Sequence, residues 1–251
     1  MKKVFALMCL LTALNMTAQH SGVVVYEQTV KIEIKLEGDA AQFADMLPKE
    51  RKFKKELIFT EEASIYRNVA DTGENDVVNE SGGGGRNFMM RMATPDDIVY
   101  NDLENNKCIE QKDFFTRNFL IENDMENFRW KMTGNKKEIA GYMCMEAEVV
   151  DSMKKTTAWF TPQIPVSSGP GIYTGLPGLI LAIEENEGQN ITMAVSIDLK
   201  PVSDKELKRP SKGKKVTQEE FQKIVEEKMA EMGGGSGGRP GGGQMQFIIK
   251  Q

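Results

Sequence analysis

Histidine is almost absent from this sequence, because the only one in 251 residues is His20. Triads that activate a serine or a cysteine need a histidine base, and zinc enzymes usually bind their metal through several imidazoles. A single histidine near the N-terminus builds neither arrangement. The sequence therefore excludes these hydrolase and zinc-enzyme classes, and it shows no nucleophile with a plausible base.

Cysteine is also scarce, with Cys9, Cys108 and Cys144. Cys9 lacks the small residue that a lipid-attachment site places just ahead of its cysteine. Cys108 and Cys144 are expected on strands separated by two others, whereas a disulfide requires Cα atoms within about 7 Å of each other. An oxidising compartment permits the disulfide. Two small, buried apolar side chains are the preferred interpretation.

One pronounced apolar run, Val4–Leu14, is much shorter than the roughly 20 residues of a membrane-spanning helix. Lys2 and Lys3 precede it, and small and polar residues follow, which is the order of a secretory signal. We expect residues 1–18 to be a signal peptide, cleaved after Ala18 or one residue later. The mature chain would then work in the periplasm, with a peripheral position at the outer membrane left open and no transmembrane anchor.

Neither sign of charge dominates the sequence. It has 32 lysines and arginines against 37 acidic residues, which gives a net charge of −5. Basic and acidic residues are interspersed along the chain. Nucleic acid and an anionic membrane surface are therefore not indicated as partners.

Alternation of apolar and polar residues predicts an antiparallel β domain over residues 19–200. Short polar turns, such as those at 104–106, 133–135 and 187–189, would make successive strands antiparallel neighbours. The predicted fold is mainly β, a meander curled into an open or half barrel, with a short helix after Asp39. The expected strands are Gly22–Glu37, Leu57–Tyr66 (as a strand or a hairpin), Ile98–Asp102, Lys107–Gln111, Phe114–Asn123, Phe128–Met132, Lys137–Val150, Lys154–Thr161, Leu179–Glu185 and Asn190–Leu199.

The chain after residue 200 has a different composition. Residues 205–215 form a basic, polar linker. Thr217 and Glu220 form a capping box, which predicts an amphipathic helix over about 217–232. The glycine-rich tail at 233–243 is expected to be flexible, and 245–250 could add an edge strand or remain loose.

Two other segments lack the strand periodicity. Residues 71–92 include four consecutive glycines and are expected to form a flexible loop, because the strand, helix and lysine of a phosphate-binding loop are missing around them. Residues 161–178 form a crossing loop between two strands, stiffened by Pro162, Pro165 and Pro170. The preferred interpretation of this crossing loop is a shaped cover over one end of the barrel.

The crossing loop ends in the hexapeptide Gly175-Leu176-Pro177-Gly178-Leu179-Ile180, which reads GLPGLI. Over residues 130–183 the sequence resembles the GLPGLI family of Gram-negative envelope proteins. The resemblance implies a secreted antiparallel β domain, similar in outline to lipoprotein carriers with an open β barrel. It implies no assigned activity, and family members are often encoded beside energy-coupled outer-membrane transporters. The glycine- and methionine-rich C-terminus departs from the family. The other matching residues are Ile139, Gly141, Tyr142, Cys144, Ala147, Trp159, Phe160, Ile164, Pro165, Gly169 and Pro170.

The leading hypothesis for function is a periplasmic, non-enzymatic binding or accessory protein that assists outer-membrane transport and needs no cofactor. The concave side of the sheet would hold an apolar or peptidic ligand or a membrane partner. The crossing loop would partly cover that ligand. The side chains expected to line or roof the cavity are Trp159, Phe160, Ile164, Tyr173 and Leu176.

Two other functions are weighed against this one. Sixteen methionines, with Met143-Cys144-Met145 among them, offer soft ligands for Cu(I). Neighbours on a strand point to opposite faces, so this triplet cannot chelate as a unit, and methionine as adaptable core filler is preferred. A carboxylate-dependent enzyme would need two acids that converge. The pairs Asp96-Asp97 and Glu184-Glu185 are instead interpreted as solvated turn and rim residues.

Overall fold

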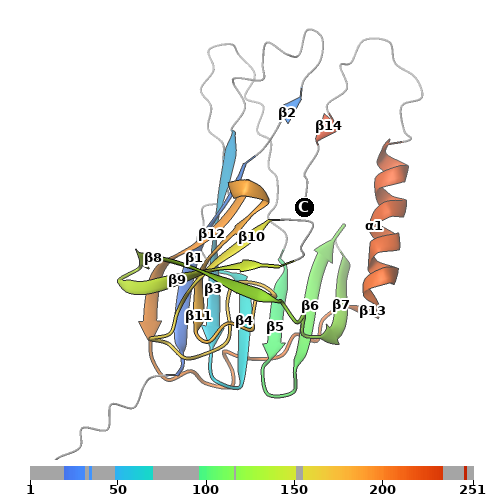
Figure 1. The fold of residues 1–251 in the computed structure, drawn as a ribbon. Coiled ribbons are helices and arrows are strands. Elements are labelled where there is room, and N and C mark those ends of the chain that lie inside the picture. The colour runs from blue at the N-terminus through green and yellow to red at the C-terminus, as the bar shows by residue number, and fades with distance from the viewer. Residues whose placement is uncertain are drawn as a thin grey trace, which may run out of the picture.

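The computed structural model describes residues 20–31, 34–35, 49–69, 96–115, 117–150, 155–233 and 246–247. The expected signal peptide, the helix after Asp39, the loop at 71–92 and the tail beyond Gly233 lie outside these ranges. The described chain forms one large curved sheet with a helix beside one edge (Figure 1).

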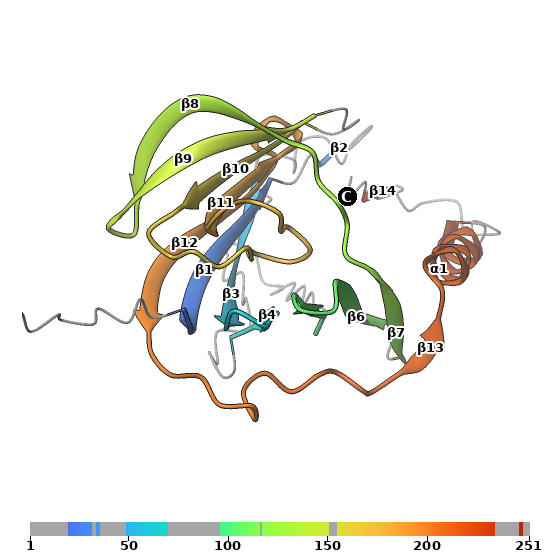
Figure 2. The same ribbon diagram turned by 60° about the horizontal axis from the view of Figure 1, so that its bottom comes forward.

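The large sheet has 12 strands in the order β13-β7-β6-β5-β4-β3-β1-β12-β11-β10-β9-β8. Only β13 is parallel to its neighbour. Two meanders, β3 to β7 and β8 to β12, flank β1, and the sheet is not closed into a barrel (Figure 2). The predicted open, mainly β architecture is confirmed, although a single meander becomes two because β1 inserts between β3 and β12. The strands are β1 Gly22–Lys31, β3 Glu50–Phe59, β4 Ala63–Asn68, β5 Ile98–Asp102, β6 Lys107–Phe114, β7 Arg117–Asp124, β8 Trp130–Ile139, β9 Tyr142–Val149, β10 Thr156–Thr161, β11 Leu179–Glu185, β12 Asn190–Leu199 and β13 Lys214–Val216.

Short elements complete the described fold. A 3₁₀ turn, η2, covers Asn186–Gly188 between β11 and β12. β2 at Ile34–Lys35 pairs with β14 at Gln246–Phe247 in a separate two-stranded sheet. The possible edge strand at 245–250 is therefore present as two residues, and it does not join the large sheet.

The β8–β9 hairpin corrects the sequence prediction, which placed a turn at 133–135. β8 runs through these residues, and its register with β9 shifts between Met132 and Lys136, as in a β-bulge. Thr133 and Asn135 both donate hydrogen bonds to Glu146 on β9, which holds the bulge in place. The hairpin turn lies instead at residues 140–141, both with positive φ. Turn-forming residues occur at both places, and local sequence does not distinguish a bulge from a turn.

The crossing loop lies inside the concave side of the sheet (Figure 2). Ser168 Oγ donates to Ser64 Oγ on β4 at 2.7 Å, and Asn101 Nδ2 on β5 donates to the Gly171 carbonyl at 3.0 Å. Ser64 and Asn101 are direct cross-strand partners and so share this face. The loop is therefore an internal plug packed on the sheet.

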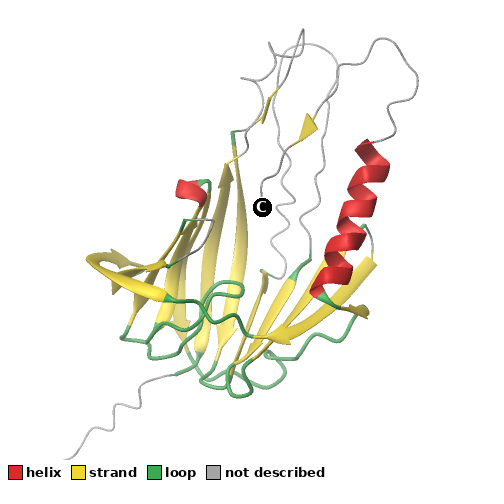
Figure 3. Ribbon diagram, turned by 45° about the vertical axis from the view of Figure 1, so that its right-hand side comes forward, coloured by secondary structure: helices red, strands yellow, loops and turns green. Residues whose placement is uncertain are grey.

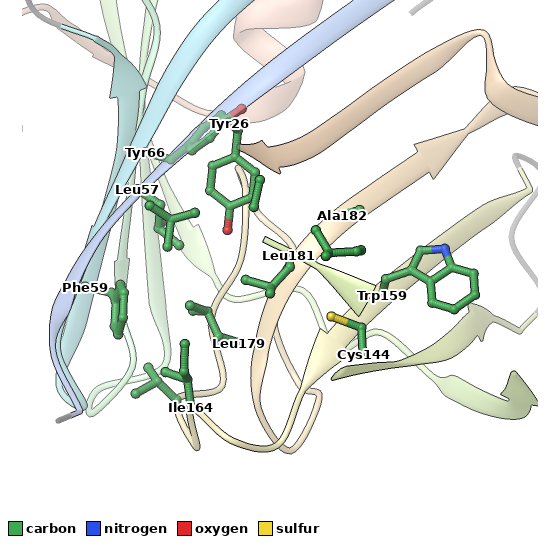
Figure 4. Close-up of a cluster of buried hydrophobic side chains, with 14 of the residues drawn as sticks. Tyr26, Leu57, Phe59, Tyr66, Cys144, Trp159, Ile164, Leu179, Leu181 and Ala182 are labelled. Atoms are coloured by element: carbon green, nitrogen blue, oxygen red, sulfur yellow. The ribbon is translucent and has the colours of Figure 1, made fainter. Parts of the chain in front are cut away.

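The main core forms where the plug meets the sheet. Leu57 and Phe59 on β3 face Ile164 and Leu179 of the loop and its junction with β11 (Figure 4). All four side chains are at most 3% exposed. Burying such a side chain contributes about 1.5–3 kcal/mol, so the loop is a major contributor to the stability of the fold.

The expected linker after residue 200 is a strap across the convex side. It leaves β12, passes under the sheet and ends as β13 on the far edge (Figure 2). Arg209 Nη2 lies 2.8 Å from Glu122 Oε1 on β7 and fastens the strap to the sheet. The convex face of β3 to β7 carries four apolar side chains that are at most 7% exposed, namely Ile58, Ile65, Ile109 and Leu120.

The predicted C-terminal helix is confirmed as α1, Gln218–Gly233, which stands beside β7 (Figure 3). The capping box is formed: Thr217 N–H donates to Glu220 Oε2, and Glu220 N–H donates to Thr217 Oγ1. Phe221 and Ile224 pack on Val216 and neighbouring residues of β7. No helix among the described residues is long and apolar enough to cross a membrane.

Both described cysteines are free and buried. Cys108 lies on β6 and Cys144 on β9, and seven strands separate them: β5, β4, β3, β1, β12, β11 and β10. The sequence pattern predicts two intervening strands. The difference arises because the chain passes from β7 at one side of the sheet to β8 at the other edge.

Candidate functional site

Four of the five side chains predicted to surround a cavity are core residues. Phe160, Ile164 and Leu176 are each 1% exposed, and Trp159 is 8% exposed. Phe160 and Leu176 share a second apolar cluster, whereas Trp159 and Ile164 belong to the main core. Tyr173 is half-buried, whereas the other four side chains have almost no free surface.

The GLPGLI hexapeptide closes the plug. Gly178 has φ +154°, and a Cβ there would lie 2.2 Å from the carbonyl oxygen of Thr161, at the other end of the loop. Only glycine allows the two ends of the loop to approach this closely. Leu176, Leu179 and Ile180 of the same motif are buried in the two clusters. The described contacts thus give the motif a structural role.

Beyond the plug, the concave face becomes polar. Cross-strand pairing places Val30, Asn190, Glu185 and Thr156 in one row across β1, β12, β11 and β10. We use the name polar belt for six half-buried or buried side chains on this part of the concave face: Gln28, Lys55, Tyr66, Tyr173, Glu185 and Asn190.

Glu185 is the centre of the polar belt. Tyr173 donates its hydroxyl to Glu185 Oε1 at 2.5 Å, and Asn190 Nδ2 donates to Glu185 Oε2 at 2.8 Å. Gln28 Nε2 continues the chain to Asn190 Oδ1 at 3.3 Å. Burial raises the pKa of Tyr173 above its usual range, and the nearby Glu185 carboxylate raises it further. Tyr173 is therefore a neutral hydrogen-bond donor at physiological pH.

Tyr66 connects the two halves of the belt. Burial raises the pKa of its hydroxyl, a hydrogen bond with Thr192 opposes this shift, and Glu185 adds to it. Its ring meets the ring of Tyr26 edge-on, with centroids 6.0 Å apart. The side chain of Tyr66 thus links β4, which carries it, to Thr192 on β12.

Lys55 brings a positive charge to the belt. Its Nζ lies 6.0 Å from the centroid of the Tyr66 ring. Burial lowers the pKa of Lys55, Asp97 and Asp96 oppose that shift, and Lys112 reinforces it. Among the described residues no carboxylate lies within ion-pair distance of this ammonium.

An aromatic cluster borders the belt where the chain enters β8. Phe128, Trp130 and Tyr173 have ring centroids 5.0 to 6.4 Å apart. Trp130 Nε1 donates to the Thr174 carbonyl at 2.8 Å, which fixes the indole against the plug. All three rings are half-buried. The cluster offers apolar surface directly beside hydrogen-bonding groups.

The residues of the alternative hypotheses do not converge. Glu184 faces away from Glu185 and pairs with Lys137 at 3.2 Å, and Lys137 also covers the Trp159 ring. Asp97 Oδ1 accepts the Asp113 N–H at 2.8 Å.

The methionine–cysteine triplet is divided between the two faces of β9. Met143 is half exposed, whereas Cys144 is fully buried. In the part of the chain that the structure describes, no group of three or more His, Cys, Asp or Glu side chains is placed to hold a metal ion.

Most residues of the polar belt were not predicted from the sequence, although the alternation of residues along one strand gave a signal. On β3, Lys55 occupies the same alternating face as Leu57 and Phe59, where an apolar residue would be expected. A lysine at such a position is a sign of function or of a buried partner. Glu185 gives no comparable local signal, because its partners come from distant parts of the chain.

The match to a known protein family falls on the plug. A family model described as a protein of unknown function (Porph_ging) matches residues 148–182, which cover β10, the crossing loop and the first half of β11. The likeness to that family is limited to this segment. No curated protein matches the chain.

Solved structures extend the comparison to the fold. Two crystal structures of PNGF-II, in space groups P21 and C2, each have a TM-score of 0.54 and 15% identity. Each covers 82% of this chain, and the chain covers 33% and 32% of the respective PNGF-II structures. The chain thus spans about a third of the length of PNGF-II. At this identity the likeness concerns the fold alone.

Proposed function

We propose that this chain is a non-enzymatic binding protein of the periplasm, which holds a ligand at the polar belt on its concave face. The supporting observation is the combination of half-buried hydrogen-bonding groups with the cluster of Phe128, Trp130 and Tyr173. Binding sites combine apolar and aromatic walls with a few well-placed polar groups in this way.

The location and partner are part of the same proposal. The signal-like N-terminus supports export, and the GLPGLI hexapeptide at 175–180 supports membership of that envelope family. The family resemblance supports an accessory role beside an outer-membrane transporter. A curved sheet that is not closed into a barrel suits transfer of a ligand between two partners.

The ligand that we propose is more polar than the sequence suggested. The apolar side chains under the plug are buried in the core and leave no surface for a ligand. The polar belt offers instead a carboxylate, two amides, two phenols and an ammonium group. A ligand with hydrogen-bonding groups and one flat apolar part fits these side chains.

The concave face is a better site than an edge of the sheet. β8 forms one edge, and its lysines, Lys131 and Lys136, together with the bulge at 133–135 interrupt a regular pairing surface. Such charges and bulges are typical of edges that resist pairing with another chain. Addition of a peptide strand to β8 is therefore disfavoured.

A pair of tryptophan substitutions on β1 tests the proposal. Val30→Trp fills the concave face beside Asn190, whereas Thr29→Trp places the same bulk on the opposite face. Each protein is incubated with envelope extract, repurified and examined by native mass spectrometry, with circular dichroism as the folding control. We expect the wild type and Thr29→Trp to retain a ligand that Val30→Trp lacks. Equal retention by all three proteins, or no ligand on any, would contradict the proposal.

A further inference from the structure

We propose that Lys55 anchors the negatively charged group of an organic anion, so that the ligand of the polar belt is a carboxylate with an apolar body. This inference rests on the proposed function and specifies the ligand class of the same site.

The position of Lys55 is unusual for a lysine. It projects from the concave face of β3 between Tyr26 on β1 and Asn68 on β4, its cross-strand neighbours. The same face of β3 carries Leu57 and Phe59, which are fully buried. Lysines are rarely placed in such surroundings without a partner, because a charged group loses hydration there.

Lys112 on β6 is another lysine on the concave face, and a carboxylate of the same strand balances its charge. Its Nζ lies 2.8 Å from Glu110 Oε2. Among the described residues, Asp97 and Asp96 act on the Lys55 ammonium without forming an ion pair, and Asp97 already accepts the Asp113 N–H. An anion from outside the described chain would supply the missing counter-charge.

The surroundings of Lys55 also define the rest of the ligand. The Tyr66 ring lies beside the ammonium group, and Phe53 is the next residue on the same face of β3. These rings suit an apolar body. Glu185 lies on the same face and would repel a second negative charge, whereas it accepts hydrogen bonds. The site therefore selects a monoanion that also carries a hydrogen-bond donor or stays clear of Glu185.

Calorimetric titration with paired probes tests the inference. Decanoate is compared with decan-1-ol, and an acetylated apolar tetrapeptide with a free carboxylate is compared with its amide. The variants are Lys55→Met and Lys55→Arg, and Lys54→Met is the matched control, since Lys54 is exposed on the opposite face of the same strand. Tighter binding of decanoate indicates a fatty-acid-like ligand, and tighter binding of the peptide indicates a chain terminus.

We expect Lys55→Met to weaken binding of the preferred carboxylate by about 10- to 100-fold, the loss typical of a charged hydrogen bond. Lys55→Arg should retain part of the affinity, Lys54→Met all of it, and the neutral analogues should bind every protein equally weakly. Thermal unfolding checks that Lys55→Met is folded. Unchanged carboxylate binding by Lys55→Met, or no binding of either carboxylate by the wild type, overturns the inference. If Val30→Trp still abolishes retention of an envelope ligand in that case, the binding function stands and only the role of Lys55 fails.

Discussion

Tyr173 donates its hydroxyl to Glu185 at 2.5 Å, and this bond joins the tip of the crossing loop to the end of β11. The two residues are only twelve positions apart, yet the chain between them completes the plug and a full strand. The same bond borders the proposed ligand site. The Tyr173–Glu185 hydrogen bond therefore contributes both to the stability of the plug and to the geometry of the site.

Removing that hydroxyl gives the first prediction. Tyr173→Phe leaves Glu185 without one of its two donors, and we expect the free energy of unfolding to fall by about 1.5–3 kcal/mol, as for other hydrogen bonds to charged groups. Urea denaturation measures the change. Tyr142→Phe is the control, because Tyr142 is half-buried against the core and its hydroxyl makes no hydrogen bond within the described chain. Equal stability of the two variants would contradict the prediction.

The family hexapeptide supplies a second prediction. In Gly178→Ala, the added Cβ would lie 2.2 Å from the Thr161 carbonyl oxygen, so the two ends of the plug must separate. We expect a loss of at least about 3 kcal/mol, by comparison with other strained core substitutions. Pro177→Ala is the neighbouring control, since Pro177 is exposed. If urea denaturation shows similar stabilities for both variants, the motif has a role other than closing the plug.

Elements that local interactions define could be predicted from the sequence, and features that depend on long-range pairing could not. β5, β11 and β12 have the predicted bounds, because alternation of apolar residues and flanking turns is local information. The bulge at 133–135 was mistaken for a turn, because Thr-Gly-Asn suits both structures. The strap after residue 200 and the placement of β8 at the far edge depend on which strands pair over long distances, which no local pattern encodes.

For the candidate site, too, local features could be predicted from the sequence and long-range contacts could not. Ile164 and Leu176 were expected to line or roof a cavity, but the degree to which they fill the concave face is set by tertiary packing. Lys55 was recognisable from its alternation with Leu57. Glu185 was not, since its partners Tyr173, Asn190 and Tyr66 reach it from three different elements.

The buried thiols give a prediction on pH. Burial raises the pKa of Cys144 from 9.0 to about 11 and that of Cys108 to about 12. Between pH 9 and 11 the unfolded chain loses these protons while the folded chain keeps them, so stability is complete below pH 9 and falls as pH rises. For each thiol the loss at pH 10.5 is on the order of 2 kcal/mol.

Urea denaturation of the wild type and Cys144→Ala at pH 8 and pH 10.5 measures this effect. Buried tyrosines such as Tyr66 act in the same direction in both proteins. The difference between the two proteins therefore isolates the thiol. We expect the wild type to lose more stability than Cys144→Ala over this interval, and neither cysteine to react with a thiol reagent at pH 8 before unfolding. Parallel pH profiles, or rapid labelling of the folded protein, would show that the thiols are accessible.

The docking of α1 gives the last prediction. The ring of Phe221 lies 5.4 Å from that of Phe119 and 6.0 Å from that of Phe114, and with Ile224 it forms the described contact of the helix with the sheet. Phe221→Ala should cost about 2–3 kcal/mol of local stability, less than a fully buried phenylalanine, because the ring is half-buried.

Because the plug and the main core do not include α1, the effect of Phe221→Ala should remain local. Amide exchange across 218–231 should accelerate, whereas exchange in β1 and β11 should be unchanged. Met229→Ala is the control, since Met229 lies on the same apolar stripe but is 54% exposed. Faster exchange throughout the sheet would mean that α1 and the polar belt unfold as one unit, and loss of α1 would then also impair ligand retention.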